Sequence, residues 1–193
     1  SWIPLAAEDA QSPFLALFPA SLEKILGIGL AIRIVTQIYD VQPGSPVSTF
    51  VMIVGAVTLF IGVAMALIQK DMKKLLSYHA ISQVGYMILG VGSALPIGIV
   101  GALFHMINHV LYKSGLFLTA GALEKRTGTT DLKRISGLGK FMPVTAACFV
   151  VFGLAISGFP GLNGFFSKEL VFDAALESNV AFYIVALVGA AMT

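Results

Sequence analysis

Three ionisable residues recur at every fourth position of a long apolar stretch: His105, His109 and Lys113. In an α-helix these positions fall within an arc of about 80° and rise by about 12 Å, so their side chains would form a ladder along one face. Histidine titrates near neutral pH, and lysine can exchange protons in a buried setting. The pattern therefore predicts a proton relay along one helix.

Two other roles stay open for this ladder. A histidine pair with i, i+4 spacing can bind a metal ion, although neither the glutamate of an H-E-x-x-H pattern nor a neighbouring cysteine accompanies this pair. Each group can instead hydrogen-bond a neighbouring helix and serve only in helix association. Three such groups on one arc favour a relay over both alternatives, and we expect no metal site.

A run of helix-breaking residues precedes another lysine. Three glycines and one proline lie between Gly158 and Gly164, within an apolar stretch, and Lys168 follows. Such a run predicts a broken helix, and irregular backbone at membrane depth is tolerated only inside protein or against water. Broken helices are also where transporters place ion sites. We expect Lys168 to begin a second half-helix, whose positive dipole end disfavours its charge, and to release protons. The alternative is an ordinary loop between two short helices.

Four further residues are candidates for the same path. Lys24 lies in the middle of an apolar stretch, where it carries a proton, snorkels or pairs with a carboxylate on another helix. Glu23 precedes it, but adjacent helical positions point about 100° apart, so the two need not pair. Glu169 either pairs with Lys168 or marks the membrane surface. His79 is predicted near the surface, as a proton-entry group or as an interfacial histidine without a role.

The amino-acid composition indicates whether the chain is surrounded by water or by lipid. The chain has 193 residues, of which 57% are hydrophobic and 11% are charged, whereas soluble domains carry about 25% charged residues. Its single cysteine excludes a disulfide scaffold, and a net charge of +2 is too small for a nucleic-acid-binding surface. We expect a protein that is dissolved in a lipid bilayer.

Six apolar segments have the character of membrane helices, which need about 20 apolar residues each. They cover approximately residues 15–39, 47–68, 75–92, 97–123 and 142–176, and a sixth begins near residue 180. The sequence lacks the alternation of strands, so we predict an all-α integral membrane protein. Both ends are apolar, which suggests a piece of a longer chain that is truncated at both ends. Glycines at close helix contacts are expected at Gly85, Gly90, Gly101, Gly115 and Gly121.

The connections between these segments differ in charge. Residues 69–74 and 124–140 are rich in lysine and arginine, whereas residues 40–45 and 92–96 contain neither. Alternating spans place both basic connections on one side of the membrane, and the positive-inside rule makes that side cytoplasmic.

Four stretches, in order, resemble the motifs of a known family. They are W-I-P-L-A-A-E-D-A from Trp2, Q-K-D-M-K-K-L-L-S-Y from Gln69 with S-Q-V-G-Y from Ser82, F-H-M-I-N-H from Phe104, and F-P from Phe159 with F-S-K ending at Lys168. Over essentially its whole length, the chain resembles the antiporter-like membrane subunits of respiratory complex I. That family is shared with membrane-bound hydrogenases and multi-subunit sodium/proton antiporters.

The resemblance implies a bundle of about fourteen helices with two inverted five-helix repeats. This chain would run from the end of the seventh helix to the start of the thirteenth, with residues 1–40 ending the first repeat and residues 46–193 forming most of the second. The discontinuous twelfth helix would break at Phe159–Gly164. The family's ionisable groups fall on Lys24 in the eighth helix, on the ladder in the eleventh and on Lys168 in the twelfth.

The resemblance also implies a function, which is proton or sodium translocation by a membrane subunit of a redox-driven complex. That complex would be an NADH:quinone oxidoreductase or an energy-converting hydrogenase in the inner (plasma) membrane. The alternative is a subunit of a sodium/proton antiporter without a redox partner, and a structural subunit that has lost transport fits the retained ladder less well. Glu23 and His79 depart from the family pattern, which favours a hydrogenase-like or divergent branch.

The implied partners are other membrane subunits and the lipid bilayer, with no nucleic acid. The sequence contains neither a Gly-rich phosphate loop nor a cysteine cluster for an iron–sulfur centre. We therefore expect no cofactor in this chain.

Overall fold

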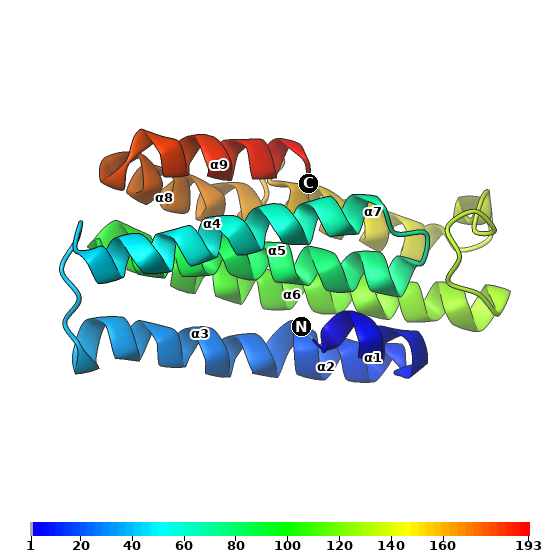
Figure 1. Cartoon of the computed structure of the whole chain (residues 1–193). Helices are drawn as coiled ribbons and strands as arrows, with labels where there is room; N and C mark the ends of the chain where they lie inside the picture. The colour runs from blue at the N-terminus through cyan, green and yellow to red at the C-terminus, as the bar shows by residue number, and fades with distance from the viewer. Residues whose placement is uncertain (1) are drawn as a thin grey trace.

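The computed structural model describes residues 2–193, and within this range the chain is a bundle of helices (Figure 1). Strand pairing among these residues is limited to one isolated bridge between Asp71 and Asp131. The α-helices are α1 (Ile3–Asp9), α2 (Ser12–Leu17), α3 (Glu23–Arg33), α4 (Pro46–Leu67), α5 (Met72–Gly92), α6 (Pro96–Thr127), α7 (Pro143–Ser157), α8 (Asn163–Ser178) and α9 (Val180–Ala191). Two π-helical segments, η1 (Phe18–Leu22) and η2 (Ile34–Ile38), continue α2 and α3 into one helix, and η3 (Leu138–Lys140) is a 3₁₀ turn. The predicted all-α class is confirmed.

Local sequence signals explain where the long helices begin and end. Proline occupies the first turn of α4, α6 and α7, where its missing N–H has no helical partner to lose. Asp71 caps α5 by accepting a hydrogen bond from the backbone N–H of Lys74. Gly128 and Gly158 end α6 and α7 with positive φ angles of 72° and 85°, which favour glycine.

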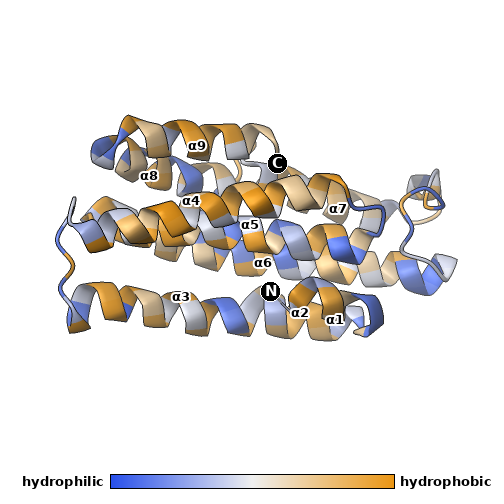
Figure 2. Ribbon diagram, in the orientation of Figure 1, coloured by the Kyte–Doolittle hydropathy of each residue, from blue (hydrophilic) through white to orange (hydrophobic). Residues whose placement is uncertain are grey.

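Helices cover all six predicted segments, with a break in the fifth. By length and composition, two stretches are long and apolar enough to cross a membrane, Ser12–Ile38 and Pro46–Leu67, and α7 and α9 are shorter apolar helices. Figure 2 shows that α4 and α9 are almost wholly hydrophobic, whereas polar residues gather on α5 and α6 in the middle of the bundle. Large apolar side chains such as Leu26, Phe50, Ile61 and Val150 are exposed on the outside. The polarity is therefore inverted relative to a soluble bundle.

Both basic connections lie at the same end of the bundle, as predicted. The backbone N–H of Met72 donates to the carbonyl of Thr130 at 2.9 Å, and that of Leu132 donates to the carbonyl of Lys70 at 2.9 Å. The connections α4–α5 and α6–α7 therefore touch, and Figure 1 shows them on the side away from the loop between η2 and α4. We call this side, formed by residues 68–71 and 128–142, the basic end.

Close helix contacts hold α5 and α6 at the centre of the bundle. A Cβ atom added at Gly85 would overlap the backbone of Leu59 on α4, and one added at Gly115 would overlap the ring of Phe152 on α7. The other three predicted contact glycines also lie against neighbouring elements. Small residues thus allow the close approach that apolar helices in a membrane require.

The predicted broken helix is present. Helix α7 ends at Ser157, the irregular segment covers residues 158–162, and α8 begins at Asn163. Gly164 is already helical, and an added Cβ there would collide with the carbonyl of Ala155, so only glycine lets α8 approach α7 this closely. The prediction that Lys168 begins the second half-helix is wrong, because Lys168 is the sixth residue of α8. The charge effect of the helix dipole fades beyond the first turn.

Candidate functional site

The α6 ladder points into the bundle. His105, His109 and Lys113 are each fully buried. His105 is held on both sides, with Nδ1 at 2.9 Å from the hydroxyl of Ser167 on α8 and Nε2 at 3.0 Å from Oε1 of Gln83 on α5. The ladder therefore links three helices and does not face the outside of the bundle.

The other two ladder residues have no hydrogen-bond partner within residues 2–193. Both ring nitrogens of His109, Nζ of Lys113 and the neighbouring hydroxyl of Tyr112 are buried and unpaired. Leaving such a group unsatisfied costs about 1–3 kcal/mol, and more when the group is charged. Buried polar atoms of this kind are normally satisfied by another protein group or by ordered water. The arrangement suits groups that exchange protons through water better than groups that tie two helices together.

A second polar face, on α5, lies opposite the ladder. It consists of His79, Gln83 and Tyr86, which are spaced i, i+4 and i+7. The Tyr86 ring meets the His105 ring edge-on at a centroid distance of 5.8 Å, and its hydroxyl donates to the carbonyl of Ala186. Gln83 and Tyr86 were not predicted as site residues, because the candidates were lysine, histidine and glutamate residues, although the helical spacing of both from His79 is visible in the sequence.

His79 is buried within the bundle. It is the eighth residue of α5, it is 8% exposed, and its Nδ1 is buried without a hydrogen-bond partner in the described chain. Its position relative to the membrane surface, and its role as a proton-entry group or as an interfacial histidine without a role, stay predictions. Because α5 begins three residues earlier than the predicted span, the position falls in the third turn of the helix and not at its start.

Lys168 is buried beside the helix break. Its ammonium donates to the carbonyls of Ile156 at 2.9 Å and Ser157 at 3.3 Å, and it lies 5.2 Å from the centroid of the Tyr86 ring. These carbonyls form the C-terminal end of α7, where the helix dipole is negative and favours a cation. The dipole that acts on Lys168 is thus that of α7, with the opposite sign to the predicted one.

Glu169 does not take part in this site. Its side chain is exposed, and among residues 2–193 no carboxylate lies within ion-pair distance of Lys168. Backbone carbonyls, and not an acid, therefore hold the Lys168 ammonium.

Lys24 is also buried, and it has a carboxylate partner. Its Nζ lies 3.6 Å from Oε2 of Glu23, at the wall of a cavity of about 270 Å³. The 100° offset left this pairing open, and the two long side chains bridge it. The preceding π-helical segment η1 is tied to α6, since the hydroxyls of Ser21 and Ser114 both donate to the carbonyl of Ala16. This junction places Lys24 within electrostatic range of Lys113.

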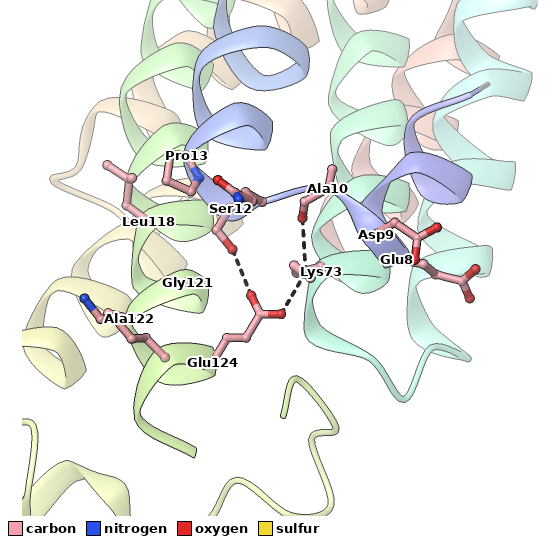
Figure 3. Close-up of a pocket in the computed structure, with 12 residues that line it drawn as sticks. Glu8, Asp9, Ala10, Ser12, Pro13, Lys73, Leu118, Gly121, Ala122 and Glu124 are labelled. Atoms are coloured by element: carbon pink, nitrogen blue, oxygen red, sulfur yellow. Dashed lines mark hydrogen bonds and ion pairs between the residues drawn. The ribbon is translucent and has the colours of Figure 1, made fainter. Parts of the chain in front are cut away.

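A different buried lysine lies at the basic end. Lys73, which the sequence reasoning counted as a loop cation, is 4% exposed in the first turn of α5, so that assignment is wrong. Its Nζ lies 2.9 Å from Oε1 of Glu124 on α6 and donates to the carbonyl of Ala10, while Ser12 donates to the other carboxylate oxygen (Figure 3). The pair lines a cavity of about 540 Å³. Lys73 thus has two acceptors within the chain, one of which is a carboxylate.

Residues 2–193 contain no group of three or more histidine, cysteine, aspartate or glutamate side chains that is arranged to hold a metal ion.

Comparisons with known proteins bear on the whole chain. The family model described as NADH:quinone oxidoreductase/Mrp antiporter, transmembrane, matches residues 1–193. One of the subunits of a Na(+)/H(+) antiporter from Alkalihalophilus pseudofirmus is 41% identical over 192 residues, which are 99% of this chain and 38% of that protein.

Solved structures agree with these matches. A chain of the Mrp complex from Dietzia sp. superposes with a TM-score of 0.92 at 32% identity, covering 99% of this chain and 35% of that one. A chain of respiratory complex I from Thermus thermophilus superposes with a TM-score of 0.90 at 30% identity, covering 99% and 40%. This chain therefore spans well under half the length of these relatives.

Proposed function

Because the chain belongs to the transmembrane family of NADH:quinone oxidoreductase and Mrp antiporter subunits, we propose that it forms part of an ion-translocating membrane subunit. Its ionisable groups on α3, α6 and α8 would carry protons through the bundle. The observation that carries this proposal is the buried ladder, in which His109 and Lys113 have no partner within the described chain. In a purely structural role, no interaction would offset the free-energy cost of burying these groups.

The path would run from Lys24 to Lys168. The charge of Lys24 interacts with Lys113 and with His109, so a proton gained or lost at Lys24 changes the proton affinity of the other two groups. Ordered water would bridge the unpaired atoms of His109 and Lys113. His105 would then pass a proton towards α8, where its Nδ1 shares a hydrogen bond with the hydroxyl of Ser167, the residue that precedes Lys168 in the sequence.

Lys168 would be the release group at the far end of this path. The carbonyls of α7 and the face of Tyr86 stabilise its charged form. Added positive charge on neighbouring His105 would oppose that form and favour loss of the proton, since the two groups act on each other electrostatically. Repulsion between adjacent sites thus supplies a direction for transfer.

Two kinds of complex can use such a subunit. The 41% identical relative is named as part of a sodium/proton antiporter, whereas another match belongs to respiratory complex I. The ionisable groups of this chain suit both, and other membrane subunits are the expected partners in either case. The protein composition of the purified complex distinguishes them, because quinone-reductase or hydrogenase subunits accompany it only in the redox-driven complex.

We also propose that the basic end faces the cytoplasm and that the complex lies in the plasma membrane. The exposed Lys133 of the α6–α7 connection offers a test. In a background in which Cys148 is replaced by serine, Lys133→Cys should react with an impermeant maleimide only from the cytoplasmic side. Labelling from the outer side alone would reverse the orientation.

Loss of the ladder tests the function itself. In the assembled complex, reconstituted into vesicles, Lys113→Ala should lower ion transport by about 100-fold, the scale of a positioned acid–base group. Thr119→Ala is the matched control, because Thr119 is also buried on α6 but bonds only to the carbonyl of Leu116 on its own helix. Wild-type transport by Lys113→Ala would refute the proposal.

A further inference from the structure

The contact between Gln83 and His105 sets the register of α5 against α6. The two helices are antiparallel, since only residues 93–95 connect them, and Gln83 Oε1 lies 3.0 Å from His105 Nε2. One turn further towards the basic end, four residues back on α5 and four forward on α6, this register places His79 opposite His109. The two histidines also act on each other electrostatically, which agrees with their facing positions.

Unpaired polar atoms concentrate at this level of the bundle. Nδ1 of His79, Nε2 of Gln83 and both ring nitrogens of His109 are buried without a hydrogen-bond partner in residues 2–193. These four atoms come from two adjacent turns of α5 and one facing residue of α6. Ordered water needs two to four polar partners, which this group provides. The facing surfaces of α5 and α6 therefore suit a short chain of water molecules between the two imidazole rings.

His79 differs from the ladder in its access to the outside. It is 8% exposed, whereas His105, His109 and Lys113 are each 0% exposed. It also lies only about 10 Å along α5 from Met72, at the basic end. By the same register Lys113 lies one turn nearer the basic end but is fully buried, so His79 is the one of these four residues with surface that solvent can reach.

We infer that His79 is a further proton-relay residue, which exchanges protons between the basic end of the bundle and His109 through water held between α5 and α6. This inference rests on the proposed function. An imidazole ring can accept a proton at one nitrogen and release another from the second nitrogen. One proton enters at Nε2 and another leaves from Nδ1, so the ring is neutral again but in its other tautomer, and a ring flip or tautomerisation then restores the starting tautomer.

The groups around His79 favour transfer of a proton through its ring over retention of the proton on the ring. The titratable groups that interact with its charge are Lys113, Lys168, His105 and His109, and all four are bases. A carboxylate would hold a proton on the ring as an ion pair, whereas these bases, when they are protonated, repel it. Gln83, one turn along the same face, is neutral and can hydrogen-bond the intervening water with its free amide.

The test compares His79→Gln with the wild type in the complete complex, reconstituted into vesicles. Glutamine keeps a hydrogen-bonding side chain but cannot carry a proton. We expect transport to fall by about 10- to 100-fold, with a changed pH profile. External imidazole should restore part of the rate in His79→Ala. Ser77→Ala is the matched control, because Ser77 is buried on α5 but bonds only to the carbonyl of Lys73 on its own helix.

Two results would overturn the inference. One is wild-type rate and pH profile in His79→Gln. The other is a rate lowered by the same factor at every pH in both His79 variants, without rescue by imidazole, which would mark a structural residue. Lys113→Ala, measured in parallel, separates the two proposals. If Lys113→Ala is inactive while His79→Gln transports normally, only the relay role of His79 is refuted. If Lys113→Ala transports normally, the proposed function itself is refuted.

Discussion

Two buried lysines of the same bundle, Lys73 and Lys113, have opposite surroundings. Lys73 at the basic end contacts a carboxylate and a backbone carbonyl, so its charge is fully compensated. Lys113 in the middle of α6 has no hydrogen-bond partner in the described chain and lies 5.9 Å from the centroid of the Phe117 ring. Burial alone therefore does not identify a transport residue. The two lysines differ in whether a carboxylate contacts the ammonium group.

A carboxylate partner matters because it holds a lysine in its protonated state. A carboxylate at 2.9 Å stabilises the ammonium of Lys73 and opposes loss of its proton. Lys113 has only other bases and a ring nearby, so both of its protonation states are accessible with the help of water. We interpret Lys73 as a structural contact between α5 and α6, and Lys113 as a group that carries protons. Lys168, which is held by carbonyls alone, falls between the two.

The largest effect is expected at Lys168. Replacing it with alanine removes the release group but leaves α7 and α8 packed through glycine, so transport should fall by about 100-fold in an assembled complex. Lys168→Glu should retain part of the activity only in its protonated form, because an ionised carboxylate would face the carbonyls of Ile156 and Ser157. Transport by Lys168→Glu should therefore decline as the pH rises. Vesicle assays at several pH values measure both variants, and a wild-type ion-to-electron or exchange ratio in Lys168→Ala would make Lys168 structural.

An intermediate effect, on stability and not on transport, is expected at the basic end. Glu124→Gln leaves a buried ammonium without its counter-charge, which should destabilise the bundle by about 1–3 kcal/mol, less than for a fully buried pair because Glu124 is 37% exposed. Lys73→Met should cost less, since the carboxylate left behind can be hydrated. Thermal unfolding of the purified complex gives the order of the two variants. Equal transport loss in both would contradict the structural reading of this pair.

The smallest effect is expected at the exposed pair of Lys74 and Glu8. A hydrogen bond with Glu8 raises the pKa of Lys74 above its usual value of 10.5. A raised lysine pKa means that the contact stabilises the fold below pH 10.5 and is lost as the pH rises through the higher, folded-state value. Glu8→Gln should thus lower the melting temperature slightly at pH 8, and the gap should close at the alkaline end. A gap that widens with pH would show that another group is responsible.

Much of this architecture is predictable from the sequence. Apolar runs of about 20 residues predict the spans, and the glycines and proline after Ser157 predict the broken helix. Periodicity alone predicts that His105, His109 and Lys113 share a face, and their burial follows from the cost of exposing them to lipid. The four motifs also indicated the correct family, which the comparisons confirm.

The rest depends on how the helices pack. Lys73 and Glu124 are 51 positions apart, and their contact exists only because α5 and α6 cross near the basic end. The dipole acting on Lys168 comes from α7, which the position of Lys168 within α8 does not reveal. The place of His79 in the third turn of α5 depends on where that helix begins, and helix boundaries are hard to predict from sequence alone.

The contrast between the two buried lysines can be tested with one substitution made at both positions. Lys73→Met and Lys113→Met remove the same charge and replace it with a side chain of similar length. Ion transport per assembled complex, measured in vesicles and normalised to the amount of intact complex, is the decisive quantity. We predict near-normal transport for Lys73→Met and a loss of about 100-fold for Lys113→Met. Equal transport by the two variants would contradict the assignment of Lys113, and not Lys73, to the proton path.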